Sequence, residues 1–377
     1  MLIVKENILL SGHTNIQLGG NAEYFCECIN EEQLLECLAF VKEKNLKVQI
    51  LGGGSNVIFS DEGYDGMILK TAMKNITISG KGGSDIVLVT AEAGMAWDDF
   101  VRICVSQCFA GVECLSGIPG TVGATPIQNV GAYGQEVSST ISEVTAIEIS
   151  TLNKVIFSNS DCRFGYRQSR FKSEDAGKYI ITEVKFLLKR NGEPEIKYPE
   201  LKEHIDNLKL KNPDTKDFTS KEDKRRKFSE FKLVRNAVIE LRKNKSMVVD
   251  ENDPNSISCG SFFINPVLNM EEYLEFESRI KNSELRKTIN EIPHFLTEQG
   301  VKIPAAWLIE NAGFQKGYRR KGAGISSKHT LAIINSGGNT KDVLDLAKEI
   351  ESGVNTLFGI KLETEPQIIN YSGGVVK

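Results

Sequence analysis

The stretch from Ser116 to Gly134 constrains what this chain can fold into more than any other part of the sequence. It reads Ser-Gly-Ile-Pro-Gly-Thr-Val-Gly-Ala-Thr-Pro-Ile-Gln-Asn-Val-Gly-Ala-Tyr-Gly, with five glycines in nineteen residues. Backbone of this kind lets main-chain N–H groups approach a ligand closely. The segment also contains apolar residues that need burial, which argues against disorder, and structureless loops beyond about 12–15 residues are usually functional. A long surface loop without a ligand is the alternative.

A second glycine cluster, Gly52-Gly53-Gly54-Ser55-Asn56, follows the apolar run Val48–Leu51. A strand that ends in a glycine turn is a good binding place for pyrophosphate oxygens. The first cluster has the spacing Gly-x-x-Gly-x-x-Gly, not the Gly-x-Gly-x-x-Gly of a Rossmann helix, and no P-loop motif occurs in the chain. Two separate glycine-rich loops therefore favour a bulky dinucleotide held by backbone amides from both sides.

Three further segments contain candidate catalytic or ligand-binding residues. The segment 162–172 has four cations interleaved with three aromatic residues, which indicates an anion site with stacking walls or, alternatively, a solvated basic hairpin. Ser261 lies in Gly-Ser-Phe-Phe rather than in Gly-x-Ser-x-Gly, so a hydrolase nucleophile is not supported and a turn serine is the simple reading. On a strand, Glu363 and Glu365 would share one face. The simple interpretation is that this face is exposed to solvent and binds nothing.

Composition is that of an ordinary soluble chain, with 377 residues, 40% hydrophobic and 25% charged residues and a net charge of −4. This charge recruits neither nucleic acid nor membrane, and the basic run Lys224–Lys227 fits an exposed helix of mixed charge. No signal peptide and no membrane span is expected, which predicts a cytoplasmic protein. The eight cysteines show no Cys-x-x-Cys spacing, so no metal site is expected, and small buried side chains are predicted.

Hydrophobic periodicity predicts several elements. Helices are expected over 31–44 (capped by Asn30), 97–109, 233–241, 302–312 and 340–354, and strands over 48–51, 67–69, 86–93, 144–149, 155–157, 179–188 and 329–335. The charge-rich segment 189–232 contains an expected insertion, most evident over 221–232.

Five motifs in order resemble a known family. They are Leu51-Gly-Gly-Gly-Ser-Asn-Val57, Ile118-Pro-Gly-Thr-Val-Gly123, Pro126-Ile-Gln-Asn-Val-Gly-Ala-Tyr-Gly134, Cys162-Arg-Phe-Gly-Tyr-Arg167 and Gly260-Ser-Phe-Phe263. Together they are similar to UDP-N-acetylenolpyruvoylglucosamine reductase, a flavin enzyme of peptidoglycan precursor synthesis. The resemblance extends from about Ile16 to about Ile369.

The resemblance implies an α+β chain with a two-subdomain FAD-binding fold of the vanillyl-alcohol-oxidase type and a C-terminal α+β substrate domain. The boundaries expected are 1–72 and 73–240 for the two FAD-binding subdomains, 250–352 for the substrate domain, and 353–377 for a strand that returns to the active site. It also implies FAD and NADPH as cofactors, a UDP-sugar as substrate, and a monomer.

The resemblance assigns roles residue by residue. Arg167, Ser261 and Glu365 match the catalytic residues, with Ser261 as proton donor. Tyr166, Tyr198, Lys245, Asn265 and His329 are the expected substrate contacts. Many relatives have a lysine in a Pro-x-x-Pro-Lys-like run where this chain has Met-Val-Val-Asp, so Lys245 or Arg242 would have to replace that phosphate contact. The expected FAD contacts are Gly52, Gly53, Gly54, Ser55, Asn56, Val57, Ile118, Pro119, Gly120, Gly123, Ala124, Gln128, Asn129, Gly131, Ala132, Tyr133 and Gly134.

Two other functions remain open at this point. The first is another flavin oxidoreductase of the same fold, which the Gly-Ser-Phe-Phe and Leu-Glu-x-Glu segments disfavour. The second is a binding protein without turnover, which the joint presence of Arg167, Ser261 and Glu365 disfavours. Only four histidines occur, and none indicates a covalent flavin link.

Overall fold

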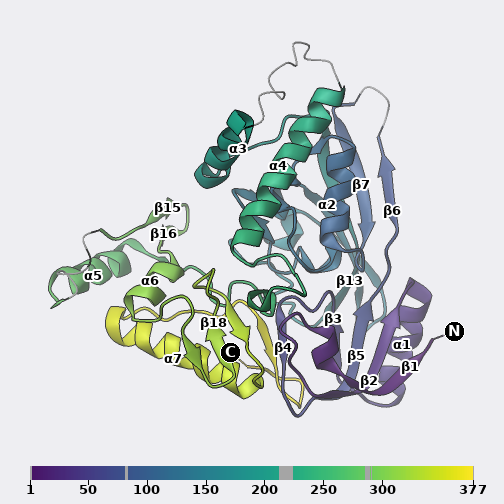
Figure 1. Ribbon diagram of the computed structural model, residues 1–377. Helices are drawn as coiled ribbons and strands as arrows, with labels where there is room; N and C mark the ends of the chain where they lie inside the picture. The colour runs from purple at the N-terminus through teal and green to yellow at the C-terminus, as the bar shows by residue number, and fades with distance from the viewer. Residues whose placement is uncertain (1, 81–83, 212–223, 285–288, 290, 377) are drawn as a thin grey trace. The chain divides into compact units, whose positions relative to one another are not determined.

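The computed structural model describes residues 2–80, 84–211, 224–284, 289 and 291–376. They form two compact units. Unit 1 comprises Met1–Ile8, Ala22–Gly54 and Asp65–Val248, and unit 2 comprises Leu9–Asn21, Ser55–Tyr64 and Val249–Lys377. The four-part division expected from the resemblance is finer than this one and stays a prediction. Helices and strands mix throughout both units (Figure 1), as expected for an α+β chain.

The first sheet of unit 1 has the strand order β1-β2-β5-β3. Its strands are β1 (Val4–Leu9), β2 (Asn21–Cys28), β5 (Tyr64–Thr71) and β3 (Val48–Leu51). Helix α1 (Glu31–Glu43) begins after Asn30, whose side-chain oxygen accepts the backbone N–H of Gln33 at 2.9 Å, so the predicted cap is confirmed. The helix buries one apolar stripe in the same cluster as residues of β2 and β5.

The second sheet of unit 1 has six strands in the order β12-β11-β13-β7-β6, with β8 paired to β13. Their bounds are β6 (Ile76–Ser79), β7 (Ile86–Glu92), β8 (Phe109–Ala110), β11 (Ile141–Glu148), β12 (Lys154–Ser158) and β13 (Tyr179–Arg190). The predicted hairpin of β11 and β12 is confirmed. Alternate residues of β7 and β13 are buried, and they share one apolar cluster with residues 97–105.

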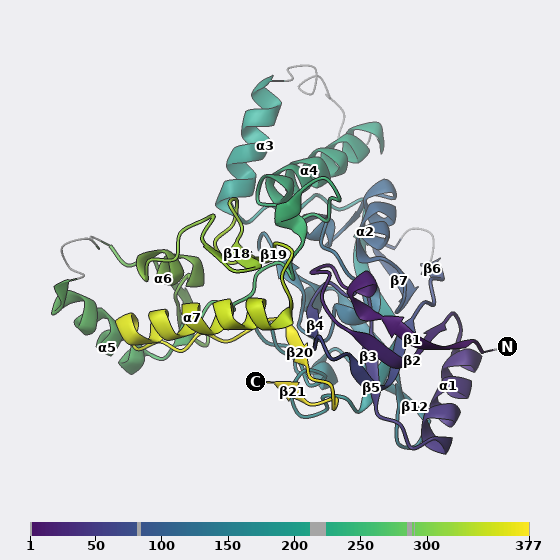
Figure 2. The same cartoon turned by 60° about the horizontal axis from the view of Figure 1, so that its bottom comes forward.

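Helix α2 (Trp97–Ser106) packs on this sheet, with the rings of Phe100 and Phe186 at 4.5 Å between centroids. The prediction that this helix continues to Phe109 is wrong. Cys108 has φ +55°, which ends the helix, and Phe109 pairs with β13 instead. The view in Figure 2 shows α4 (Lys224–Asn244) close to both α2 and α3 (Pro199–Lys211), in agreement with their packing.

Helices α3 (Pro199–Lys211) and α4 (Lys224–Asn244) complete unit 1. The predicted helix over 233–241 is confirmed but begins earlier. Val234 and Val238 of α4 belong to one buried cluster with Leu201 and Ile205 of α3. Within the insertion expected over 221–232, residues 221–223 lie outside the described part of the chain.

Unit 2 contains three small sheets. In the first, β4 (Val57–Phe59) pairs in parallel with β20 (Gln367–Ile369), and β20 pairs with β21 (Val375–Val376). The other two have the orders β14-β16-β15 and β17-β18-β19. Their strands are β14 (Val267–Leu268), β15 (Phe295–Thr297), β16 (Gly300–Lys302), β17 (Arg319–Arg320), β18 (Ala323–Ile325) and β19 (Ile333–Asn335). The strand predicted from His329 is wrong in its first half, because residues around 330 form a turn.

The helices of unit 2 are α5 (Met270–Lys281), α6 (Ala305–Asn311) and α7 (Thr340–Phe358). They bury their apolar faces in a single cluster with β16, β18 and β19. Asn339 caps α7 by accepting the Asp342 N–H at 2.9 Å, which decides between Asn339 and Thr340, the two caps that the sequence allowed. The predicted helix over 302–312 is shorter, since Pro304 is its cap. No helix in the described ranges is long and apolar enough to cross a membrane.

Candidate flavin and substrate site

The two glycine clusters of the sequence lie side by side in unit 1. A Cβ atom on Gly53 would lie 2.7 Å from the Cα of Gly120, and one on Gly52 would lie 2.8 Å from the Thr121 hydroxyl oxygen. Real Cβ atoms do not approach other atoms this closely, so a side chain at Gly53 would collide with backbone, and one at Gly52 would displace the Thr121 hydroxyl. The third glycine of the spacing, Gly123, approaches Ala93 in the same way, at 2.5 Å. Close contact between backbones is therefore one physical reason for the glycine spacing.

Thr121 carries a buried hydroxyl without a hydrogen-bond partner. It lies at the junction of the two glycine clusters and is only 9% exposed. An unsatisfied buried hydroxyl is costly, and in native proteins it commonly indicates an unseen water or ligand. The sequence analysis did not include Thr121 among the cofactor contacts. The motif Ile-Pro-Gly-Thr-Val-Gly was the available signal, but sequence does not reveal whether a hydroxyl is paired.

Replacing Thr121 by valine removes this hydroxyl while keeping the shape of the side chain. We expect the affinity for FAD to fall about three- to tenfold, the effect of one lost hydrogen bond. The apo protein should be as stable as before or more stable, because no unpaired polar atom is then buried. Flavin titration by fluorescence and thermal unfolding of the apo protein measure the two effects.

Thr125→Val is the matched control, since the Thr125 hydroxyl donates to the Val122 carbonyl at 2.8 Å. That variant should lose stability. Unchanged FAD affinity in Thr121→Val would show that the Thr121 hydroxyl does not serve the cofactor.

The first glycine of the loop is held on both sides by charged residues. The Gly117 N–H donates to the Asp98 carboxylate at 2.6 Å, and the Gly117 carbonyl accepts from Arg242 Nε at 3.2 Å. Arg235 of α4 donates twice to Asp98 of α2, at 2.7 and 2.6 Å. Burial would raise the pKa of Asp98, but the hydrogen bonds from Arg235 and Gly117 outweigh it and lower that pKa. Arg242 is thus engaged in shaping the loop.

Asp98→Asn should weaken this clamp. Because the pKa of Asp98 is lowered in the folded state, its contribution is present at neutral pH and is lost as the pH falls below the ordinary carboxylate range, about 4. We expect the variant to lose about 1 kcal/mol at neutral pH, a small value because the Asp98 side chain is 40% exposed. The difference in stability between the variant and the wild type should shrink in acid. Thermal unfolding measured from neutral pH down into the carboxylate range tests this.

Asp99→Asn is the control for this prediction, since Asp99 forms only an exposed pair with Arg102. It should change stability very little. Equal effects of the two substitutions would contradict a specific role of Asp98 at Gly117.

Tyr166 and Arg167 lie at the tip of a tight turn in unit 1. Gly165 and Gln168 exchange backbone hydrogen bonds at 3.0 and 3.1 Å, so the two residues between them form the turn. The Arg167 guanidinium donates to the Gly131 carbonyl at 2.7 Å and lies 5.5 Å from the Tyr166 ring centroid. The turn therefore places Arg167 directly on the glycine-rich loop.

The other cations of the segment 162–172 hold this turn in place. Arg163 pairs with Glu174 at 2.7 Å, and Arg170 pairs with Asp175 at 2.6 Å. Lys172 donates to the Arg167 carbonyl at 3.0 Å. Two of the four cations, Arg163 and Arg170, are thus paired with the carboxylates of Glu174 and Asp175, and the anion site inferred from the segment stays a prediction.

The buried side chain of Asn129 stabilises the glycine-rich loop by hydrogen bonds. Its side-chain N–H groups donate to Glu136 and to the Gly165 carbonyl, both at 2.9 Å, and its oxygen accepts from the Ser138 N–H. Asn129 is 1% exposed and has φ +46°, which asparagine tolerates better than most residues. Its amide thus supports the loop and joins it to the turn that carries Arg167.

The expected substrate residues of unit 1 form a second group. The Tyr133 ring meets the Tyr198 ring edge-on at 5.6 Å between centroids, and burial raises the pKa of Tyr133 to about 12. Tyr198 is 43% exposed. Lys245 donates to both carboxylate oxygens of Glu200, at 2.7 and 2.8 Å. A phosphate contact by Lys245 would have to compete with this ion pair.

In unit 2, the segment that follows Ser261 pairs with the segment that contains Glu365. The Glu365 N–H donates to the Phe262 carbonyl at 2.9 Å, and the Ile264 N–H donates to the Glu363 carbonyl at 2.9 Å. Phe262 is fully buried, which anchors the residue next to Ser261. Glu363 is exposed, whereas Glu365 is half-buried. The strand predicted through both glutamates is wrong in its extent, since regular pairing with β4 begins only at Gln367.

Three other predicted residues of unit 2 have visible structural partners. Asn56 donates to the Glu365 carbonyl at 3.2 Å. The side-chain oxygen of Asn265 accepts the Ala305 N–H at 2.8 Å, at the start of α6. His329 Nδ1 accepts the Leu331 N–H at 3.0 Å in the turn before β19.

The predicted residues thus form two groups, one in each unit. Unit 2 contains Ser55, Asn56, Val57, Ser261, Asn265, His329 and Glu365. Unit 1 contains Gly52, Gly53, Gly54, Ile118, Pro119, Gly120, Gly123, Ala124, Gln128, Asn129, Gly131, Ala132, Tyr133, Gly134, Tyr166, Arg167, Tyr198 and Lys245. The motif Leu51–Val57 passes from one unit to the other.

Family models match both parts of the chain. Residues 22–151 match an FAD-binding domain, and residues 253–369 match the C-terminal domain of UDP-N-acetylenolpyruvoylglucosamine reductase. The chain is therefore an FAD-binding flavoprotein with a second, C-terminal domain, and the expected fold class is confirmed.

Relatives with full-length similarity identify the family. The UDP-N-acetylenolpyruvoylglucosamine reductase of Thermobifida fusca is 40% identical over 97% of this chain and 97% of its own length. That of Mycobacterium tuberculosis is 36% identical over 97% of this chain and 95% of its own. The crystal structure of the enzyme from Thermus caldophilus has the same fold, with a TM-score of 0.62 at 20% identity over 98% of this chain and 99% of that chain. The chain belongs to the UDP-N-acetylenolpyruvoylglucosamine reductase family.

Proposed function

We propose that this chain reduces the enolpyruvyl group of UDP-N-acetylglucosamine enolpyruvate with NADPH, and so forms UDP-N-acetylmuramate for peptidoglycan synthesis. The observation that carries the proposal is that UDP-N-acetylenolpyruvoylglucosamine reductases are 36–40% identical to this chain over nearly its whole length. The hydrogen bond from the Glu365 N–H to the carbonyl of Phe262, the residue after Ser261, supports it, because it brings these two chain segments together.

The glycine cradle of unit 1 fits FAD. Gly53 meets the backbone at Gly120 with no side chain between, and Gly52 faces the Thr121 hydroxyl, which has no hydrogen-bond partner. Backbone N–H groups of such loops bind the oxygens of a diphosphate, so these residues would hold that part of FAD. When bound, FAD would supply the transfer of hydride from NADPH to C3 of the enolpyruvyl group.

Arg167 is the residue proposed to meet negative charge. Addition of hydride at C3 leaves charge on C2 and on the adjoining carboxylate of the substrate. A fixed cation stabilises such charge most when it is already oriented before the reaction. The hydrogen bond to Gly131 and the tight turn around Tyr166 orient Arg167 in this way.

Ser261 is the residue proposed to supply the proton to C2, and Glu365 to polarise the substrate beside it. The reaction needs an acid at C2, because the charge there must be neutralised to give the saturated product. Main-chain hydrogen bonds join the backbone after Ser261 to the backbone at Glu365, which holds the two segments together.

The remaining expectations complete the proposal. Tyr166, Tyr198, Lys245, Asn265 and His329 are proposed to contact the UDP-sugar. We place the reaction in the cytoplasm and propose a monomer, since one chain contains every residue to which a role is assigned.

An anaerobic absorbance experiment on the purified protein tests this function. Flavin bands should bleach with NADPH and return when UDP-N-acetylglucosamine enolpyruvate is added. Bands that return only with oxygen would indicate an oxidase instead. A protein that takes up no FAD would contradict the proposal at its first step.

A further inference from the structure

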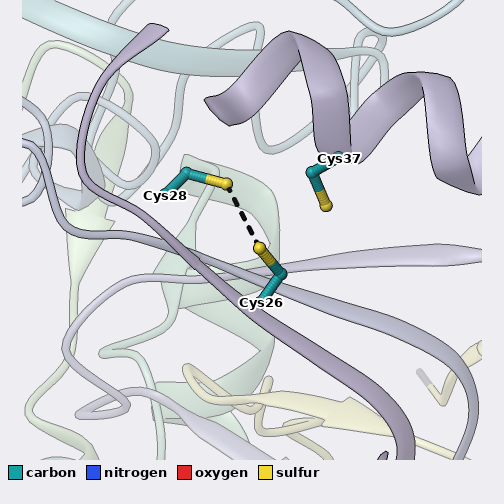
Figure 3. A group of neighbouring side chains, drawn as sticks. All are labelled: Cys26, Cys28 and Cys37. Carbon is teal, nitrogen blue, oxygen red and sulfur yellow. Dashed lines mark hydrogen bonds between the residues drawn. The ribbon is translucent and has the colours of Figure 1, made fainter. Parts of the chain in front are cut away.

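Three cysteines converge in the core of unit 1, and none of them has a role in the proposed reaction. Cys26 and Cys28 project from one face of β2, and Cys37 projects toward them from α1 (Figure 3). The Sγ atoms of Cys26 and Cys28 are 3.8 Å apart, and all three sulfurs lie within 4.8 Å of one another. Each of the three residues is 0% exposed. The tertiary structure thus creates a three-thiol group from residues that show no metal-binding spacing in sequence.

The surroundings of this group are apolar. The cluster that contains it includes Leu34, Leu38 and the thioether residues Met67 and Met73. Across the described residues, no fourth histidine, cysteine, aspartate or glutamate joins the three thiols. All eight cysteines are free and buried, as the sequence predicted, but only these three are grouped closely enough to share one ion within the described chain.

We propose that Cys26, Cys28 and Cys37 form a three-sulfur site for trivalent arsenic, taken up as arsenite. Arsenite, As(OH)₃, exchanges its three hydroxyl groups for three thiols. Each exchange breaks one As–O bond and forms one As–S bond, and the thiol proton leaves with the hydroxide as water. The arsenic remains in the +3 state, so no oxidant or reductant is needed. The proposal does not depend on the function proposed above.

Charge selects this ion over other thiophilic ions. A complex of As(III) with three thiolates is neutral, whereas Zn(II) would leave a charge of −1 and Cu(I) a charge of −2. An uncompensated charge in an apolar core is costly. Structural zinc also almost always takes four ligands, and this group offers three. A neutral, three-coordinate complex is therefore the one that this core can accept.

The spacing of the sulfurs suits stepwise binding. Cys26 and Cys28, whose Sγ atoms are 3.8 Å apart on one strand, can bind the arsenic first, and Cys37 then completes the site. Entry requires local opening of α1, which covers the group from one side.

The test uses the FAD-loaded full chain with arsenite, followed by native mass spectrometry and arsenic X-ray absorption. We expect a single arsenic per chain, three sulfur neighbours and no remaining As–O bond. The melting temperature should rise, because the bound arsenic ties α1 to β2 only in the folded state. No adduct, or an adduct with oxygen neighbours, would overturn the proposal.

Variants locate the adduct. Cys37→Ser should abolish three-sulfur coordination, while Cys104→Ser should retain it, because Cys104 is buried alone in α2. Retention of flavin absorbance shows that each variant is folded. If Cys37→Ser does not fold, the arsenic X-ray absorption spectrum of the wild type still shows whether three sulfur atoms or fewer are bound to the arsenic. An adduct unaffected in Cys37→Ser would overturn the assignment.

Discussion

Ser261→Ala is expected to slow the oxidation of the reduced flavin by the enolpyruvyl substrate by about 10²–10⁴-fold, the usual cost of losing a positioned acid. Reduction of the flavin by NADPH should remain close to wild type, because that step places no charge on C2 of the substrate. The two half-reactions can be measured separately by anaerobic stopped-flow absorbance at the flavin bands. A large effect confined to the second half-reaction would identify Ser261 as the proton donor.

Ser258→Ala is the matched control. The Ser258 hydroxyl accepts the Gly260 N–H at 3.2 Å and so supports the turn that precedes Ser261. This variant should lower the melting temperature and leave both rates nearly unchanged. Ser261→Cys retains an acidic proton and should recover part of the lost rate. Equal slowing of both half-reactions in Ser261→Ala would mean that the residue has only a structural role.

Arg167→Met is expected to reduce the rate of substrate reduction by about 10²–10³-fold, the effect of removing one preorganised donor from a site of developing charge. Some loss of FAD affinity should accompany it, because the guanidinium also holds the Gly131 carbonyl. Arg167→Lys keeps the charge but not the forked geometry, so we expect only partial recovery. Stopped-flow rates at saturating FAD separate the two effects.

Arg163→Met serves as the control in the same segment. Arg163 is exposed and pairs with Glu174, so its loss should change the rates less than about twofold. If Arg167→Met recovered wild-type rates once FAD was saturating, Arg167 would act only through the loop. The proposed role in charge stabilisation would then be wrong.

Local signals predicted many elements well. The cap of α1 at Asn30 and that of α7 at Asn339 follow from side chains that satisfy the first free N–H groups of a helix. The hairpin of β11 and β12 follows from short-range pairing. The errors fall where distant partners decide. Phe109 leaves its helix to pair with β13, and the segment after His329 turns before it becomes a strand.

The candidate site shows the same division. The motifs identified the glycine loops and Arg167, and the contacts between Gly53 and Gly120 give one of them a physical cause. Thr121 was not predicted as a cofactor contact, because the absence of a hydrogen-bond partner is a property of the packed structure. Arg163 and Arg170 were predicted with Arg167 as part of an anion site, because their ion pairs with Glu174 and Asp175 form only in the folded chain.

The family and the glycine-rich motifs that we propose to bind FAD can be recognised from the sequence, because a motif depends on residues a few positions apart. Which polar groups find a hydrogen-bond partner, and which distant residues meet, depends on the folded chain. There Gly117 is hydrogen-bonded to Asp98 and Arg242, the Phe262 carbonyl accepts the Glu365 N–H, and Cys26, Cys28 and Cys37 form one group. The physical reason is that burial and pairing depend on residues far apart in the chain, which meet only when sheets and helices pack.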